Sequence, residues 1–132
     1  MSERYFFDTS AFISIIKKEP RGQAIRLLND SLNMSQCVTS VLVAYELYRG
    51  VPPEASKRKS QLRLIATLLE KFTLKPVHEA QAMAAARIYH YSKGKLDPLL
   101  AAQCVDGGFI MVTTNRRDFE RAPGLRLATL SV

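Results

Sequence analysis

The stretch YFFDTSAFI, residues 5–13, places one carboxylate, Asp8, inside an otherwise apolar run. The aromatic triplet at residues 5–7 is typical of a short buried strand, and a helix is expected from about Ser10 to Lys18. A carboxylate buried without a partner is costly, so Asp8 needs a specific role. It is expected either to cap the helix that follows or to belong to a site at the end of the strand.

Short apolar strands alternate with helices along the rest of the chain. Further strands are expected at Cys37-Val38, Phe72–Leu74, Phe109–Thr113 and Leu125–Leu127. The expected helices are one that contains Ile25, Leu28 and Leu32, and then residues 39–48, about 54–71, 77–92, 97–107 and 115–120. Pro20 and Gly22 are expected to break the first helix. Strands that are apolar on both faces predict an α/β fold with a parallel sheet of about five short strands, covered by helices on both sides, in a single domain over residues 1–132.

The charge balance narrows the classes of partner. The chain has a formal net charge of +7 and a pI of about 9.7. This favours polyanions, with nucleic acid ahead of an acidic protein or a membrane surface. A mean hydropathy of −0.06 and the lack of an apolar run of ~18 residues argue against a membrane protein. Glu3 and Asp8 interrupt the pattern of a signal peptide, so a cytoplasmic protein is expected.

The cysteines and histidines do not suggest a zinc centre. Cys37 and Cys104 both lie in apolar sequence and are expected to be buried, reduced thiols. His78 and His90 are twelve residues apart and would not share a helix face.

Several acids fall near the carboxyl ends of the expected strands, where ligands bind in parallel α/β sheets. Asp8 follows the first strand. Asp118 lies one turn into the helix after strand 109–113, and Asp97 begins the helix that leads into that strand. A simpler interpretation stays open for each acid: Asp8 and Asp97 resemble N-caps, and Asn115 with Asp118 resembles an N-cap followed by an acidic first turn.

Glu46 is harder to explain by capping. It is expected in mid-helix, after the apolar sequence VLVAY at residues 41–45, and so faces the interior or a cleft. A buried acid needs a base, hydrogen-bond donors or a metal. Arg49, three residues further on, is the structural alternative, as an ion-pair partner.

These acids together predict one acidic cluster at the edge of the sheet. Like charges at short range raise one another's pKa, and a divalent cation relieves this conflict. Carboxylate oxygens favour Mg²⁺ or Mn²⁺, which lower the pKa of a bound water and stabilise a phosphoryl oxygen. Cations adjacent to the acids in sequence are candidates for contacts with phosphate: Arg49, Lys93, Lys95, Arg116 and Arg117. Carboxylates for a metal and cations for phosphate are the parts of a nuclease.

Four segments also resemble a known pattern: FFDTSAFI, TSVLVAYELYRG, GKLDPLLAAQC and VTTNRRDFERAPGL. In order, spacing and total length they resemble the PIN-domain ribonucleases, in particular the VapC-type toxins of prokaryotic toxin–antitoxin pairs. The last segment, with Asn-x-x-Asp-Phe followed by Pro-Gly-Leu, is the most specific. The resemblance covers nearly the whole chain. It implies a three-layer α/β/α sandwich and a metal-dependent endoribonuclease.

The resemblance assigns roles to individual residues. The family's four acidic positions correspond to Asp8, Glu46, Asp97 and Asp118. Asp8 and Asp97 would bind the principal Mg²⁺ or Mn²⁺, with Glu46 as a base toward the attacking water. Asp118 stands at the family's most variable position and would support this metal ion or a second one.

Polar and basic positions follow from the same match. Thr9 and Asn115 fall on the family's supporting polar positions, and Ser40 is a further candidate for orienting ligands or waters. Pro98, directly after the third acid in a slightly short segment, departs from the family's pattern. It leaves the approach of Lys93 and Lys95 undefined.

The resemblance also implies partners. Family members usually form homodimers, and toxin members are inhibited by a cognate antitoxin whose C-terminal segment lies in the active-site cleft, so a higher assembly is compatible with the match. The helices around residues 40–71 would form the clamp and much of the interface. The basic stretch at residues 57–59 is either an RNA or antitoxin contact or a solvated helix start.

Two other enzyme classes fit the sequence less well than a nuclease, and one non-enzymatic alternative stays open. Haloacid-dehalogenase-type phosphatases want a second aspartate where Ser10 stands. Response-regulator receivers want an acidic pair where Phe7-Asp8 stands, and a phosphoacceptor aspartate where the strand at residues 72–74 ends in Lys75-Pro76. A PIN-like module that binds RNA or protein without cleaving it remains the alternative.

Overall fold

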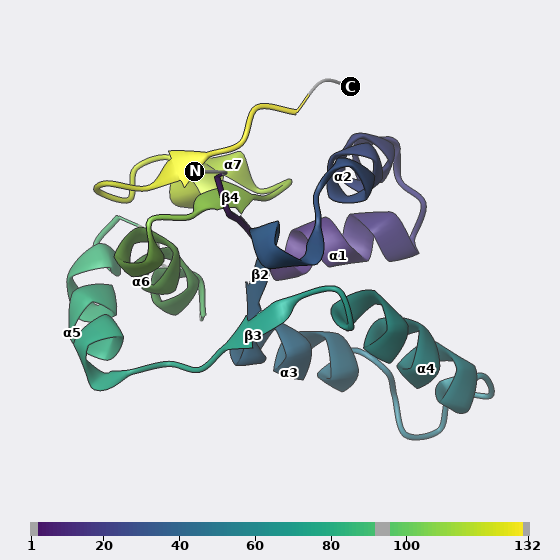
Figure 1. The fold of residues 1–132 in the computed structure, drawn as a ribbon. Helices are drawn as coiled ribbons and strands as arrows, with labels where there is room; N and C mark the ends of the chain where they lie inside the picture. Colours follow the sequence, from purple (N-terminus) through teal and green to yellow (C-terminus); the bar gives the residue numbers. More distant parts are fainter. Residues whose placement is uncertain (1–2, 92–95, 131–132) are drawn as a thin grey trace.

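A computed structural model describes residues 3–91 and 96–130. Five parallel strands form one sheet in the order β3-β2-β1-β4-β5 (Figure 1). The strands are β1 Tyr5–Phe7, β2 Cys37–Ser40, β3 Thr73–Lys75, β4 Ile110–Val112 and β5 Arg126–Leu127. The expected parallel α/β sheet is confirmed.

Helices cover both faces of this sheet. They are α1 Thr9–Ile16, α2 Pro20–Ser31, α3 Val41–Arg49, α4 Arg58–Leu69, α5 Glu79–Ile88, α6 Asp97–Gly107 and α7 Arg116–Phe119, with a 3-10 turn η1 at Met34–Gln36. Figure 1 shows α1 to α4 on one side of the sheet and α5 with α6 on the other, so the layers are α/β/α. Within the described part of the chain, no helix is long and apolar enough to cross a membrane.

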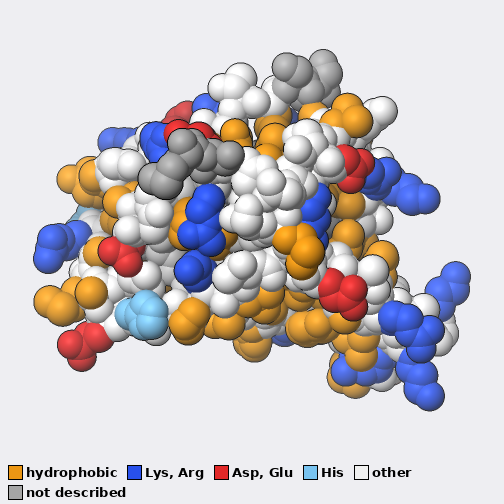
Figure 2. All heavy atoms as spheres, in the orientation of Figure 1, with side chains coloured by type: hydrophobic (Ala, Val, Ile, Leu, Met, Phe, Trp, Pro, Cys, Tyr) orange, Lys and Arg blue, Asp and Glu red, His pale blue; other side chains and the backbone are white. Residues whose placement is uncertain are grey.

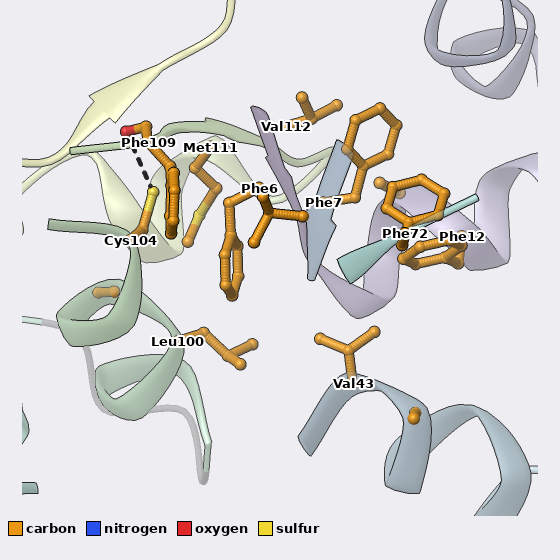
Figure 3. Close-up of a cluster of buried hydrophobic side chains, with 14 of the residues drawn as sticks. Phe6, Phe7, Phe12, Val43, Phe72, Leu100, Cys104, Phe109, Met111 and Val112 are labelled. Carbon is orange, nitrogen blue, oxygen red and sulfur yellow. Dashed lines mark hydrogen bonds between the residues drawn. The ribbon is translucent and has the colours of Figure 1, made fainter. Parts of the chain in front are cut away.

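The core lies between the sheet and both helical layers, and β1 is its centre (Figure 3). Phe7 packs against Phe12 and Phe72, with ring centroids 6.0 and 5.0 Å apart, while Phe6 stacks on Phe109 at 6.2 Å. Phe6 and Phe7 are both fully buried. Successive side chains of a strand point to opposite faces, so β1 must be apolar on both.

Both cysteines are buried and free, as expected. The Cys104 thiol donates a hydrogen bond to the Phe109 carbonyl at 3.3 Å, drawn as a dashed line in Figure 3. Burial raises the pKa of Cys104 to about 12 and also raises that of Cys37. Burial and a raised pKa disfavour the reactive thiolate, which argues against a catalytic role for either cysteine.

Several expected boundaries were wrong. The helix expected from residue 54 begins at Arg58, whose guanidinium donates to the carbonyls of Val51 and Pro52 and holds the preceding segment as a turn. Gly22 does not break a helix, because α2 begins at Pro20 and continues through it. The helix expected over residues 77–92 is shorter at both ends, because it begins at Glu79 and ends at Ile88, with Tyr89 as its C-cap. Ser92, the expected last residue, lies outside the described residues.

Candidate active site

The carboxyl ends of β1 and β4 form the centre of the site. These strands are neighbours, with Phe7 paired to Val112, and the Asp8 amide donates to the Val112 carbonyl at 3.1 Å. The chain leaves β1 into α1 on one face, and leaves β4 into α7, which contacts α6 on the other. Ligands bind in the crevice that such a change of direction opens.

Asp8 is buried here, with 3% of its surface exposed. Its Oδ1 accepts hydrogen bonds from the Ala11 amide at 2.9 Å and the Ser10 hydroxyl at 2.7 Å, and its Oδ2 accepts from the Thr113 hydroxyl at 2.6 Å. The expected N-cap of α1 is therefore confirmed, and Asp8 also faces the end of β4. Burial raises the pKa of Asp8, these three bonds oppose the rise, and the charge of Glu46 adds to it.

Sequence reasoning missed two residues of this network, Ser10 and Thr113. Besides their bonds to Asp8, their hydroxyl oxygens lie 3.2 Å apart, and they accept from the amides of Thr114 and Asn115 at 3.0 and 2.9 Å. Thr113 was expected to be the last residue of a strand. Because β4 ends at Val112, Thr113 is instead the first residue beyond it, where the strand-end rule used for the acids would have selected it.

Glu46 lies beside the N-terminus of α1. The Thr9 hydroxyl donates to its Oε1 at 2.5 Å, which joins α1 to α3. The alternative partner, Arg49, is also present, but its Nη2 lies 4.0 Å from Glu46 Oε2 and its side chain is 58% exposed, so this pair contributes little. Arg49 also lies over the Tyr45 ring, at 5.3 Å from the centroid.

Asp97 lies close enough to the other three acids for their charges to act on its carboxylate. It is the first residue of α6, and the N-cap is Leu96, so the interpretation of Asp97 as a cap was wrong. Burial, followed by the charges of Asp118, Asp8 and Glu46, raises the pKa of Asp97 to about 6. Four segments distant in sequence therefore place their carboxylates close enough to repel one another.

The remaining polar candidates have mixed outcomes. Asn115 stands at the N-cap position of α7, but its side chain makes no capping bond there, so that part of the capping interpretation was wrong. Asp118 follows in the first turn of α7 and is exposed. Ser40 is fully buried and caps α3, the helix of Glu46, by accepting from the Leu42 amide at 3.0 Å.

The basic candidates differ in how free their side chains are. Arg116 donates to the Ala128 carbonyl at 2.9 Å, while Arg117 is exposed beside it. Lys93 and Lys95 lie outside the described residues. Figure 2 shows Lys and Arg side chains gathered at the α4 end of the molecule, where Lys57 and Lys59 are exposed.

The chemistry of the carboxylate group fits a hard divalent cation. A bound divalent cation reduces the electrostatic repulsion between partly buried carboxylates and accepts their oxygens as ligands. Among residues 3–91 and 96–130, however, no three His, Cys, Asp or Glu side chains are arranged to hold a metal directly. An ion there would require the carboxylates to turn inward or to bind through waters, which Mg²⁺ commonly retains.

The parallel sheet, with acids gathered at the carboxyl ends of its strands, is typical of a nuclease-like class of α/β protein. Comparisons with known proteins identify the family. The family model of the PIN domain matches residues 5–125, and the chain belongs to this family. Within it, the chain is similar to "Ribonuclease VapC2" of Haemophilus influenzae, with 31% identity over 129 residues that cover 93% of this chain and 95% of the relative. It is 25% identical over 130 residues to "tRNA(fMet)-specific endonuclease VapC" of Salmonella typhimurium, covering 94% and 96% of the two chains. The resemblance to VapC-type members is confirmed.

Solved structures share the fold. DNA-bound VapBC of Salmonella typhimurium superposes with a TM-score of 0.76 at 21% identity, covering 96% of this chain and 98% of the other. FitAB bound to a DNA fragment gives a TM-score of 0.79 at 20% identity, covering 94% and 93%. These likenesses confirm the α/β/α architecture.

Proposed function

We propose that the chain is an Mg²⁺- or Mn²⁺-dependent endoribonuclease and the toxin of a type II toxin–antitoxin pair. The observation that carries the proposal is the gathering of carboxylates from four separate segments. Burial first, and then the charges of Asp118, Asp8 and Glu46, raise the pKa of Asp97 to about 6. The relatives named VapC ribonuclease support the reaction class.

Each acid has a role in this proposal. Asp8 and Asp97 hold the principal ion, and Glu46 and Asp118 complete the group. The ion, when bound, supplies a water of lowered pKa and stabilises the phosphoryl oxygens. Glu46 Oε2 is the candidate acceptor for the proton of the attacking water, because Thr9 already occupies Oε1. Thr9 orients the Glu46 carboxylate, as Ser10 and Thr113 orient Asp8.

The proposed partners are an RNA substrate, a cognate antitoxin and a second copy of the chain. A groove of about 540 Å³ between α1, α3 and α4 reaches Glu46 and is lined largely by apolar residues, among them Ile13, Leu47 and Ile65. This groove offers a place for an antitoxin segment. Two solved structures with this fold are VapBC assemblies, from Salmonella typhimurium and Haemophilus influenzae, and they support such a partner for this family.

Replacing Asp8 by asparagine tests the activity. Asp8→Asn keeps the shape of the side chain but removes its charge. The loss of a residue that only supports a metal ligand already costs up to about a hundredfold in activity. Because Asp8 is proposed to hold the ion itself, we expect cleavage of total RNA with Mg²⁺ or Mn²⁺ to fall by more than that. Asp30→Asn removes an exposed carboxylate of α2 and serves as the matched control, with activity retained. Undiminished cleavage by pure Asp8→Asn protein would refute the assignment.

One observation favours a second function, a module that binds RNA or protein without cleavage: the described acids do not form a ready-made metal trio. Calorimetry with Mn²⁺ alone separates the two functions. A catalytic site binds Mn²⁺ in the wild type and loses that binding in Asp8→Asn, whereas a binding module shows no difference between them.

A further inference from the structure

A second cleft, of about 770 Å³, lies beside the acids, and we call it the arginine cleft. It lies between α2, the segment from the end of β4 through α7, and the segment after β5. In Figure 1 that last segment extends from the sheet in the direction of α2. The lining includes Arg21, Thr113, Arg116, Arg117, Asp118 and Thr129.

The arginine cleft is continuous with the candidate active site. Thr113 lines it and donates its hydroxyl to Asp8 at 2.6 Å. Asp118 also lines it, and its charge acts on Asp97. A chain bound in the cleft would therefore lead directly to the carboxylates.

The charge of the cleft is opposite to that of the acidic edge. Three arginines face one aspartate, Asp118, in its lining. Arg21 Nη1 donates to the Thr114 carbonyl at 3.2 Å, which holds the guanidinium against the cleft wall and leaves its other N–H groups available. Arg117 makes no hydrogen bond or ion pair with any residue that the structure describes. Arg116 Nη1 likewise donates to a backbone carbonyl, that of Ala128, at 2.9 Å.

We propose that the arginine cleft binds the RNA backbone on one side of the scissile phosphate, with Arg21 and Arg117 as phosphate-binding residues. This inference rests on the proposed function and extends it to the path of the substrate. The planar guanidinium fork matches phosphate oxygens in a bidentate manner. RNA is favoured over an acidic protein segment because the cleft ends at the acids, where a phosphodiester has to arrive for cleavage.

The test measures binding separately from cleavage. On the Asp8→Asn background, the affinity for a short single-stranded RNA of mixed sequence is measured by fluorescence anisotropy over a range of salt concentrations. We expect Arg21→Gln to weaken binding about tenfold and to reduce the slope of log K against log salt by about 0.7, the value for one phosphate contact to a single strand. Arg21→Lys keeps the charge and restores the slope.

Arg87→Gln is the matched control. Arg87 is an exposed arginine of α5, at the opposite end of the molecule from α2 in Figure 1. Its removal deletes the same charge, and we expect affinity and slope to stay within the error of the parent. If Arg21→Gln unfolds the protein, Arg117→Gln replaces it, because that side chain has no partner among the described residues.

Binding and kinetic measurements together decide the proposal. Equal RNA binding by the Arg21→Gln and Arg87→Gln proteins overturns it. Unchanged RNA binding with weakened binding of a polyglutamate peptide also overturns it and marks a protein site instead. In the cleavage-competent chain, Arg21→Gln should raise KM and leave kcat nearly unchanged. If the wild-type chain does not cleave RNA, the proposed activity is refuted, but the comparison of RNA binding by the Arg21→Gln and Arg87→Gln proteins still decides whether the arginine cleft binds RNA.

Discussion

Asp8 is positioned by donors from two distant parts of the chain. Ser10 and the Ala11 amide hold one carboxylate oxygen, and Thr113, 105 residues away, holds the other. The Thr113 oxygen also accepts from the Asn115 amide, so one hydroxyl fixes both the acid and the turn into α7. Thr113 is thus expected to act on catalysis through Asp8, as a positioning residue.

Thr113→Val tests this role, because valine keeps the branched shape and lacks the hydroxyl. The hydrogen bond from Thr113 lowers the pKa of Asp8, so its loss should move the acidic limb of the cleavage pH profile to higher pH. We expect activity to fall about 10- to 100-fold and the free energy of unfolding to fall by about 1–3 kcal/mol. Thr113→Ser should restore the profile. A Thr113→Val protein with the wild-type pH profile would contradict the role.

At the scale of elements, the contact between α1 and α2 depends on one glycine. A Cβ at Gly22 would lie 2.1 Å from the Ser14 carbonyl oxygen, which belongs to the backbone of α1. Two further bonds tie the elements together: Arg26 donates to the Ile15 carbonyl at 3.2 Å and the Glu19 amide to the Ser14 carbonyl at 3.0 Å. Because α1 carries Asp8 at its N-terminus, this contact sets the position of the site.

Gly22→Ala should therefore destabilise the protein although alanine is the better helix former. Overpacking costs about 1–3 kcal/mol and here meets an unyielding carbonyl, while the gain in helix propensity is about 1 kcal/mol. We expect a net loss of unfolding free energy in urea denaturation. Gly50→Ala, where the nearest atom to an added Cβ is at 3.4 Å, is the control and should not destabilise. Equal stability of the two variants would contradict this close contact.

At the scale of the whole molecule, the fold gathers carboxylates that repel one another. Their charges add to burial in raising the pKa of Asp97 from its ordinary 3.8 to about 6. The folded state therefore binds more protons than the unfolded state between these values. Because proton binding and folding are linked, the contribution of Asp97 to the free energy of unfolding decreases as the pH rises from about 4 to about 6. It stays low at pH values above about 6.

This decrease in stability with rising pH can be tested on the metal-free protein. In the presence of a chelator, Asp97→Asn should gain in melting temperature relative to the wild type as the pH rises through this window, because asparagine carries no charge to bury. Asp30→Asn removes an exposed carboxylate of α2 and is the control for the loss of one charge; it should not reproduce the gain of Asp97→Asn. A constant difference between Asp97→Asn and wild type from pH 4 to 7 would contradict the raised pKa of Asp97.

The amino-acid pattern alone predicted the alternation of elements, the parallel sheet and the acids Asp8 and Asp97 near one edge. These follow from local signals: apolar strands buried on both faces, and acids next to strand and helix ends. Several element boundaries differ from those expected. Arg58 begins its helix late because its guanidinium satisfies two carbonyls of the preceding turn, and Gly22 continues a helix that it was expected to precede.

The contacts between distant side chains became apparent only in the folded chain. Thr9 against Glu46 and Thr113 against Asp8 are contacts across 37 and 105 residues, and Arg21 reaches Thr114 across 93. Hydrogen bonds of this kind depend on side-chain direction and on the crossing of helices over the sheet. No local pattern encodes either, since a hydroxyl or guanidinium in the sequence looks the same whether it faces solvent or a carboxylate.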